Sequence, residues 1–440
     1  MPALIVLFLV SLALSQVAGP ISKEVGIDFY QYWGVPVALR LSGDTLGAPY
    51  KNGQRYTETL REYAARAGDP RLQAANSFWT GPDFAASPLL YTAFTPVSRS
   101  YTASLAAFRT LQLALFLGSV LFLGHLHRLE RFYLACLALL CVLVYQPLLS
   151  DLRVANLGCF QLAALTGLLF LAGAVTRAPS FARRAALATV YLAALAALAL
   201  SKPNLLVISA LLAAHLAVRH GPRLFIASAL PAAAAAAVLA VVPCLYFGSW
   251  SVWREWYEFV YGADAYMLVR SVDSGNYSTA LLLSSRLGLD VYAVSIVLLA
   301  MLGASLLAAL AWSRRSSAAT ESSTGRAALR AAQQIVGDPR MAMAVGIVLT
   351  MAGSPLYWLH YYLLLLIPTL WLLSAPASAT YLAWLAAAAV VTSSGMLAPL
   401  FWWLQRLDAL PPSIALSWLP LWCAILLRIS SRDASDWPGV

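Results

Sequence analysis

The chain contains many apolar segments of nearly membrane-spanning length, and this pattern constrains its fold more than any other feature. Twelve such segments cover approximately residues 2–19, 103–124, 132–147, 157–175, 185–200, 205–217, 224–247, 291–312, 341–351, 358–373, 381–400 and 414–427. A straight helical span needs ~20 residues, so several segments are shorter than a full crossing. We predict an all-α polytopic membrane protein with about 12 transmembrane helices.

The composition excludes a soluble enzyme and a disordered chain. Of the 440 residues, 61% are hydrophobic and only 11% are charged. Soluble domains carry about 25% charged residues, and disordered chains are poor in aliphatic and aromatic residues. The net charge of +10 does not predict a nucleic-acid partner, because most basic residues stand singly or in pairs between apolar segments. We expect one integral membrane domain over residues 1–440.

The basic residues predict how the chain is oriented. If the N-terminus faces the cytoplasm, 14 of the 29 basic residues fall in cytoplasmic connections or the tail, and 6 fall in the opposite short loops. Short cytoplasmic loops of membrane proteins are enriched in Lys and Arg. The other nine basic residues belong to a long external stretch after the first helix. Long translocated loops are largely exempt from this rule, so those nine do not contradict the orientation.

Three longer connections separate the apolar segments. Residues 20–102 and 248–290 are predicted external loops, and residues 313–340 are a predicted cytoplasmic linker. Within the first loop, residues 56–67 have the pattern of an amphipathic helix lying on the membrane surface. Trp250, Trp253 and Tyr257 in the second loop would either anchor at the lipid interface or stack on a sugar.

The first apolar segment has two interpretations. Its length and its small residues near the end fit a cleaved signal peptide, but it lacks a positively charged start. We favour a retained first helix.

Three chemically capable residues fall at predicted external helix ends. Asp28 lies among aromatic and aliphatic neighbours just after the first helix, where partial desolvation would raise its pKa and make it a better proton acceptor. Lys202 lies in a Ser-Lys-Pro-Asn break between apolar segments, and His360 follows a Ser-Pro break among aromatic residues. Their common side predicts one external site.

Each of these residues also has a structural interpretation. Asp28 could be a solvated acid that caps the following helix, and Lys202 could extend to lipid phosphate groups. His360 could be a satisfied core residue.

Other catalytic motifs are absent from the sequence. There is no P-loop, Rossmann glycine pattern, HExxH or GxSxG motif. The sequence also lacks an Asp-x-Asp pair, so we predict no metal and no cofactor. Asn276-Tyr277-Ser278 matches a glycosylation acceptor, but so short a match is weak evidence.

A combination of short motifs resembles a known enzyme family. The early external acid Asp28 is followed by an aromatic, Pro-containing stretch at residues 87–96 that includes Tyr91. Lys202-Pro203 and a Ser-Pro…Trp…His-Tyr-Tyr…Pro pattern at residues 354–368 complete the set. This set resembles glycosyltransferase family 87, a branch of the GT-C integral membrane glycosyltransferases. The resemblance implies a GT-C-type bundle with a large first external loop that carries juxtamembrane helices.

The resemblance also implies a reaction. Members transfer a sugar, often mannose or arabinose, from a polyprenyl-phosphate-linked donor to a glycolipid or glycan acceptor on the external leaflet. Asp28 is then the expected catalytic base of an inverting transfer. The expected substrate-binding residues are Lys202, His360, Arg270, Arg286, Tyr91 and Tyr361. The expected location is a bacterial inner membrane, with the active site on the periplasmic side.

Two other functions are compatible with the same sequence. A secondary transporter also has about twelve helices with broken segments. However, such transporters usually split into two similar halves, and this chain shows no half-to-half similarity. A lipid-linked-sugar flippase would move polyprenyl phosphates across the bilayer without forming a glycosidic bond.

Overall fold

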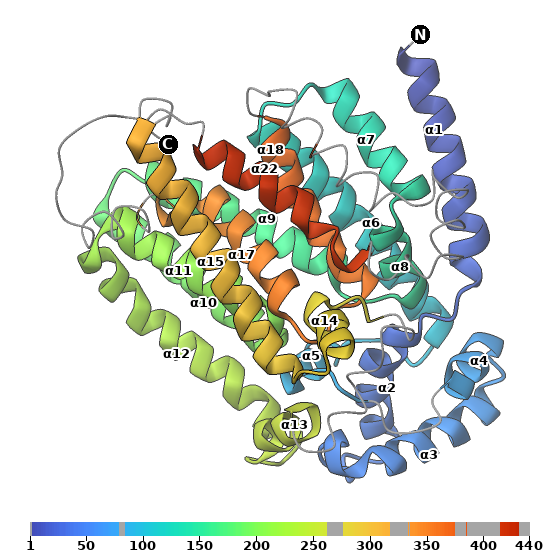
Figure 1. Ribbon diagram of the computed structural model, residues 1–440. Helices are drawn as coiled ribbons and strands as arrows, with labels where there is room; N and C mark the ends of the chain where they lie inside the picture. The colour runs from blue at the N-terminus through green and yellow to red at the C-terminus, as the bar shows by residue number, and fades with distance from the viewer. Residues whose placement is uncertain are drawn as a thin grey trace.

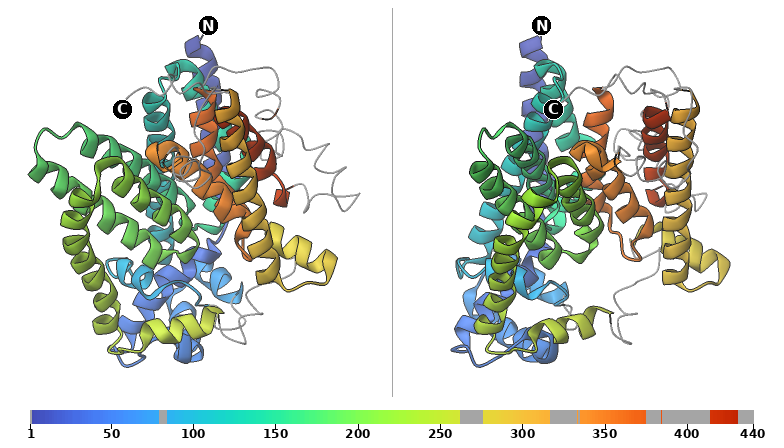
Figure 2. Two further views of the ribbon diagram at one scale, coloured as in Figure 1. Left: turned by 60° about the vertical axis from the view of Figure 1, so that its left-hand side comes forward. Right: turned by 90° about the vertical axis from the view of Figure 1, so that its left-hand side faces the viewer.

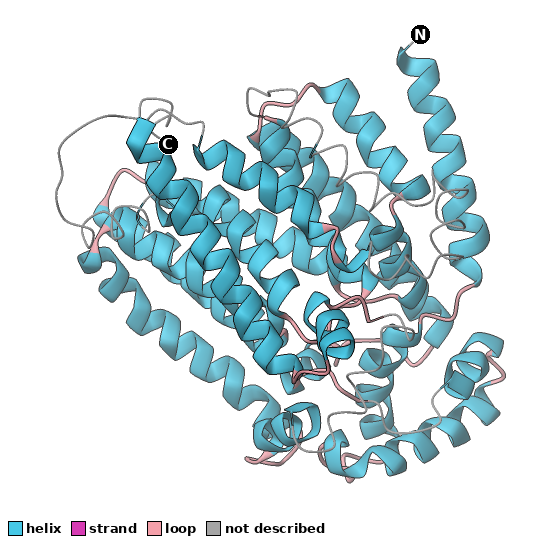
Figure 3. Ribbon diagram, in the orientation of Figure 1, coloured by secondary structure: helices cyan, strands magenta, loops and turns pink. Residues whose placement is uncertain are grey.

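The computed structural model describes residues 2–78, 84–261, 276–316, 335–374 and 414–430, together with residues 333 and 384. Within these ranges the secondary structure is helical, apart from one isolated β-bridge between Asn276 and Trp358 (Figure 3). The prediction of an all-α protein is confirmed for this part of the chain. The predicted segment 381–400 and the linker 313–340 lie mostly outside the described residues.

Among the residues that the structure describes, six helices are long and apolar enough to cross a membrane. They are α6 (Tyr101–Leu126), α9 (Gly158–Arg177), α10 (Phe181–Ser201), α11 (Leu206–His220) with the preceding η2 (Pro203–Leu205), α12 (Pro222–Tyr246) and α15 (Val291–Ser316). A bent pair, α7 (Arg131–Val144) and α8 (Gln146–Val154), adds a seventh candidate if it counts as one span, with a bend of 58°. These helices establish an α-helical membrane protein.

The predicted number of about twelve spans is not confirmed in the described ranges. The remaining apolar segments form shorter helices there, at Ile5–Ile21, Pro339–Gly353, Leu359–Leu373 and Trp418–Ser430. They contain α1 (Pro2–Gln16), η1 (Val17–Ile21), α17 (Pro339–Gly353), η5 (Leu359–Leu365), α18 (Leu366–Leu373) and α22 (Trp418–Ser430). A helix rises only about 1.5 Å per residue, so these elements are too short to cross ~30 Å of hydrocarbon without tilting or thinning the bilayer.

Six short helices gather at one end of the bundle, opposite the N-terminus of α1 (Figures 1 and 2). We call this the site end. It carries α2 (Ile27–Leu41), α3 (Pro49–Ala67), α4 (Pro70–Phe78), α5 (Pro88–Ala93), α13 (Val252–Tyr261) and α14 (Thr279–Leu287). The first four come from the stretch predicted as the large first external loop.

Two large hydrophobic clusters hold this arrangement together, and a smaller third one joins α14 to α15. One lies between the apolar helices and includes residues of α1, α6, α9, α11 and α17. The other surrounds α2 and is unusually aromatic, with Phe29, Tyr32 and Trp33 each at most 1% exposed. The helix α2 is therefore an internal element of the site end and is covered on most of its sides.

The amphipathic helix predicted at residues 56–67 is present as the second part of α3. Its predicted apolar residues Leu60 and Ala64 are buried, and Glu58, Arg61 and Glu62 are exposed. Its apolar face packs on α2, where Gly34 approaches Leu60 so closely that a Cβ there would lie 2.8 Å from a Leu60 methyl group. The apolar face of this helix is therefore covered by α2, and the expectation that the helix lies on the membrane surface stays a prediction.

Candidate functional site

Asp28 lies in the first turn of α2 at the centre of the site end. The helix begins directly after Gly26, whose φ of 72° a residue with a side chain would rarely adopt. A Cβ on Gly26 would also lie 2.6 Å from a Leu105 methyl group, so a residue with a side chain would clash at this position. One carboxylate oxygen of Asp28, Oδ2, accepts a hydrogen bond from Asn156 Nδ2 at 2.6 Å.

Lys202 lies at the break between α10 and η2, as its sequence predicted. Pro203 disfavours a helical conformation at the residue before it, and Lys202 is extended, with φ −144° and ψ 96°. Its ammonium Nζ lies 3.4 Å from the Tyr361 hydroxyl and 5.3 Å from the centre of the same ring. Lys202 and Tyr361 are 159 positions apart in sequence, so this contact joins two distant parts of the predicted site.

His360 and Tyr361 lie in η5, a 3₁₀ helix that continues into α18. The His360 side chain is 5% exposed, and its Nε2 has no hydrogen-bond partner among the described residues. The imidazole ring lies within electrostatic range of the Lys202 ammonium group. A buried ring nitrogen without a partner costs free energy, so His360 is suited to bind a ligand group or a water molecule.

Tyr32 connects the two sides of the site. Burial, and next the negative charge of Asp28, raise the pKa of the Tyr32 hydroxyl, and Tyr361, Tyr91 and Asp151 add to this effect. The elements that carry these residues also pack on one another: α2 contacts α5, which carries Tyr91, and α8, and α8 contacts η5, which carries His360 and Tyr361. The structure therefore brings Asp28, Lys202, His360, Tyr91 and Tyr361 into one region.

Of the two predicted arginines, the structure describes Arg286 alone, and no contact joins it to this region. Arg286 is an exposed residue in the last turn of α14, a helix that packs against α15 and α17. Arg270 lies outside the described residues. Tyr91 is fully buried in α5, and its hydroxyl lies 3.5 Å from Gln31 Oε1.

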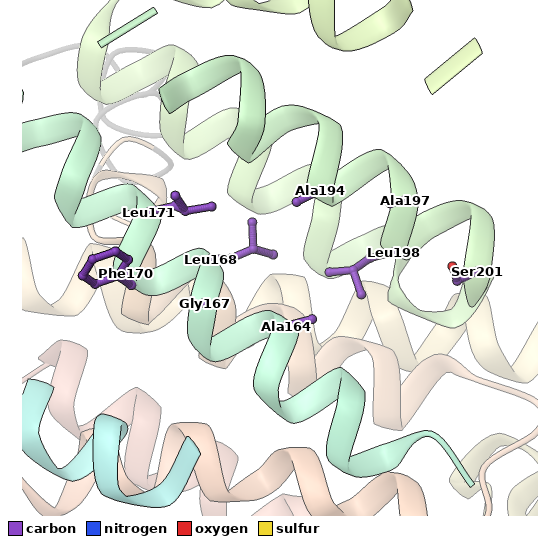
Figure 4. A pocket seen from close by; sticks show the side chains of 9 residues that line it. All are labelled: Ala164, Gly167, Leu168, Phe170, Leu171, Ala194, Ala197, Leu198 and Ser201. Atoms are coloured by element: carbon purple, nitrogen blue, oxygen red, sulfur yellow. The ribbon is translucent and has the colours of Figure 1, made fainter. Parts of the chain in front are cut away.

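An apolar groove of about 470 Å³ runs between α9 and α10, and Ser201 lies at one end of it (Figure 4). Its lining is apolar except for one hydroxyl: Ala164, Gly167, Leu168, Phe170, Leu171, Ala194, Ala197, Leu198 and Ser201. Ser201 is the last residue of α10 and directly precedes Lys202. The groove thus ends one residue before Lys202 in the sequence.

Gln161 is a site residue that sequence reasoning missed. It lies three residues before Ala164 and seven before Leu168, so it continues the groove-lining face of α9 toward the site end. Its side chain is 4% exposed, and neither amide atom has a hydrogen-bond partner among the described residues. A buried unpaired amide is as costly as the His360 nitrogen, so each side chain is a candidate to contact a polar ligand group.

The segment that carries His360 is held by a second group that the sequence did not reveal. Asn276 is fully buried: its Nδ2 donates to Pro355 O at 3.1 Å, and its Oδ1 accepts from Tyr357 N at 2.8 Å. Ser278 donates to Ser354 O at 2.5 Å. Asn276-Tyr277-Ser278, the apparent glycosylation acceptor, therefore forms part of the protein interior.

No cluster suited to a metal ion occurs in the described ranges, where no three His, Cys, Asp or Glu side chains converge. Comparison of the whole chain with protein-family models, with curated proteins and with solved structures finds no match in any of the three. The site must therefore be interpreted from its own residues.

Proposed function

We propose that the chain is a GT-C-type glycosyltransferase, of the family 87 kind, that transfers a sugar from a polyprenyl-phosphate donor to a glycolipid or glycan acceptor. The observation that carries this proposal is the apolar groove that ends at Ser201, the residue directly before Lys202 in the sequence. A donor of this class combines a long apolar chain with an anionic phosphate. The groove provides an apolar surface for the chain, and Lys202 provides a cation where the phosphate would lie.

The polar residues around Lys202 fit the rest of such a donor. His360 and Gln161 offer buried hydrogen-bonding groups that no described residue satisfies, and sugars and phosphates carry many complementary groups. Tyr361 and Tyr91 add hydroxyls and aromatic faces in the same region. Of the two predicted arginines, Arg270 in the second external loop is the one that we expect to approach the donor phosphate.

Asp28 is the proposed catalytic base. In this reaction the Asp28 carboxylate takes the proton from the acceptor hydroxyl, and the acceptor oxygen forms a bond to the anomeric carbon. The bond from that carbon to the phosphate oxygen breaks, and polyprenyl phosphate departs with the electron pair. Since the leaving group is already stable as an anion, no acid is needed, and Lys202 stabilises the developing charge. A single displacement inverts the anomeric centre.

The proposed setting is the plasma membrane of a bacterium, with about twelve spans and with the site end facing the periplasm. The orientation of the basic residues supports this placement. The four shorter apolar helices, at Ile5–Ile21, Pro339–Gly353, Leu359–Leu373 and Trp418–Ser430, add to the six or seven longer candidates and bring the number of possible spans closer to twelve.

Product analysis separates this proposal from its rivals. The purified chain is reconstituted in vesicles with polyprenyl-phosphate mannose that is labelled in the sugar, together with a membrane glycolipid extract as acceptor. Label in a new glycosidic product supports the transferase. Labelled donor that crosses the bilayer unchanged indicates a flippase, and concentrative uptake of a soluble solute indicates a transporter. Either of the last two results, without product, contradicts the proposal.

A further inference from the structure

Asn156 connects Asp28 to the turn between α8 and α9. The turn begins at Ala155, which ends α8 with a φ of 54°. Asn156 is 5% exposed, and each of its polar groups has a partner. Its backbone N–H donates to Asp151 O at 3.1 Å, and its backbone carbonyl accepts from Gln112 Nε2 at 2.8 Å.

The orientation of the Asn156 side-chain amide follows from these contacts. Its Oδ1 accepts from the backbone N–H of Leu157, and a carbonyl oxygen is the only side-chain atom of Asn that can accept there. Nδ2 must therefore face Asp28 and donate to its carboxylate. This bond is strongest when Asp28 is ionised, because a charged acceptor strengthens a hydrogen bond.

Asp151 stabilises the turn between α8 and α9. Its side chain is fully buried, and its two oxygens accept from the N–H groups of Gly158 at 2.8 Å and Cys159 at 3.0 Å, in the first turn of α9. Gln112 Nε2 donates to the same carboxylate at 3.0 Å. A Cβ on Gly158 would lie 2.6 Å from Asp151 Oδ1, so only glycine fits beside it.

Arg109 fixes the approach to α2 relative to this turn. It is 7% exposed, and its guanidinium donates to the carbonyls of Leu152 at 2.9 Å and of Glu24 and Arg153 at 3.0 Å. Arg109 and Gln112 lie three residues apart on α6, so one helix holds both the segment before Asp28 and the turn that carries Asn156.

We propose that Asn156 is a positioning residue for Asp28. Its amide, locked by the turn that Asp151, Gln112 and Arg109 hold, fixes the direction of the Asp28 carboxylate and favours its ionised form. The role of Asp28 as a base rests on the proposed function. The contact between the two side chains does not, so it can be tested separately.

Few other groups around Asp28 titrate in the same range. The buried titratable and charged residues on α2 and on the elements that surround it are Tyr30, Tyr32, Tyr50, Tyr56, Tyr91, Tyr101, Arg109, Asp151 and Tyr361. Burial raises the pKa of the Tyr30, Tyr32 and Tyr50 hydroxyls above the usual tyrosine value, and so further from the range in which a carboxyl group titrates. Asp151 is the only other carboxylate of this set, and it contacts Asn156 through backbone bonds.

The ionisation of Asp28 is measured without any assay of activity. The chain in detergent is treated across a pH series with a hydrophobic carbodiimide, which reacts with protonated carboxyl groups, and labelling of Asp28 is quantified by mass spectrometry. We expect Asn156→Ala to move the half-labelling pH upward by about one unit. Asn156→Asp retains the size and the acceptor oxygen but adds a like charge, so its shift should be larger. Asn52→Ala, which removes an amide bonded within α3, is the control and should leave it unchanged.

A second measurement uses the transfer reaction. In vesicles with the labelled donor, Asn156→Ala should move the acid limb of the kcat/KM profile upward by about the same amount. Unfolding temperatures identify variants that do not fold, and Asn156→Asp then replaces Asn156→Ala. An unchanged labelling midpoint in a folded variant overturns the positioning role, whatever the reaction. A shifted midpoint in a chain that forms no glycosidic product leaves this inference intact and overturns the proposed function instead.

Discussion

At the scale of single residues, the site depends on polar groups inside an apolar protein. Asp28 and Lys202 could be singled out from the sequence, because an isolated charge beside an apolar segment is costly to bury and is kept there only for a structural or functional role. Asn156 and Gln161 were not, because neutral amides carry no comparable signal in sequence. Only their burial, and in Gln161 the lack of partners for both amide atoms, identifies them.

Replacing Asp28 by Asn tests the catalytic base. The amide keeps the size of the carboxylate and an oxygen that can accept from Asn156 Nδ2, so the fold should be retained. An amide cannot take the acceptor proton, and we expect transfer to fall by about 10²–10⁴-fold with donor affinity unchanged. Initial rates in vesicles and equilibrium binding of the donor measure the two quantities.

The matched control is Asp290→Asn. Asp290 accepts from Tyr292 N and Ala293 N at the start of α15, a role that Asn also performs. The Asp290→Asn variant should retain full activity. A rate for Asp28→Asn within tenfold of the unaltered chain would remove Asp28 from its role.

Replacing Lys202 by Ala tests the phosphate contact. Hydrogen bonds to charged groups contribute about 1.5–3 kcal/mol, so the donor should bind roughly 10- to 100-fold more weakly. Acceptor KM should change little. Lys23→Ala removes an exposed lysine shortly before α2 and serves as the control. Equal donor affinity in the two variants would exclude a phosphate at Lys202.

At the scale of elements, the breaks in the helices organise the site. The break at Lys202-Pro203 and the Ser354-Pro355 break were predictable, since proline interrupts the helical pattern. The segment at 276–278 that supports residues 354–362 was not, because its contacts join positions 76 to 85 residues apart. No local pattern reports such a distance. The 58° bend between α7 and α8, by contrast, has a local cause, because Pro147 stands in the first turn of α8.

Replacing Asn276 by Ala tests this support. The change removes the partners of Pro355 O and of the N–H groups of Ser278 and Tyr357. Each buried group left unpaired costs about 1–3 kcal/mol, so the unfolding temperature in detergent should fall, and donor binding should weaken as His360 loses its fixed position. Gln54→Ala, at an exposed bond within α3, should change neither. An unaltered unfolding temperature would show that Asn276 does not hold this segment.

At the scale of the whole molecule, the apolar segments predicted the helices well. Every predicted segment that falls in the described ranges is helical, with ends shifted by a few residues. The number of spans was less predictable, because hydropathy does not distinguish a short crossing helix from one buried beside others. The surroundings of α2 also escaped prediction: aromatic residues that could face lipid form an internal cluster.

The orientation of the molecule gives the last prediction. Glu62 on α3 has a side chain that is 75% exposed at the site end. Arg183 is exposed in the first turn of α10, and the other end of α10 carries Ser201 beside Lys202. A helix of 21 residues is about 30 Å long, so the two positions lie on opposite sides of the bilayer.

Single cysteines at these two positions distinguish the sides. In intact cells a membrane-impermeant maleimide should label Glu62→Cys, whereas Arg183→Cys should react only after permeabilisation. The unaltered chain measures the background from its five cysteines, of which Cys141, Cys159 and Cys244 are buried. The reverse pattern would place Asp28 and Lys202 in the cytoplasm, where a periplasmic transfer is impossible. The orientation derived from 14 basic residues against 6 would then have to be abandoned together with the proposed location of the reaction.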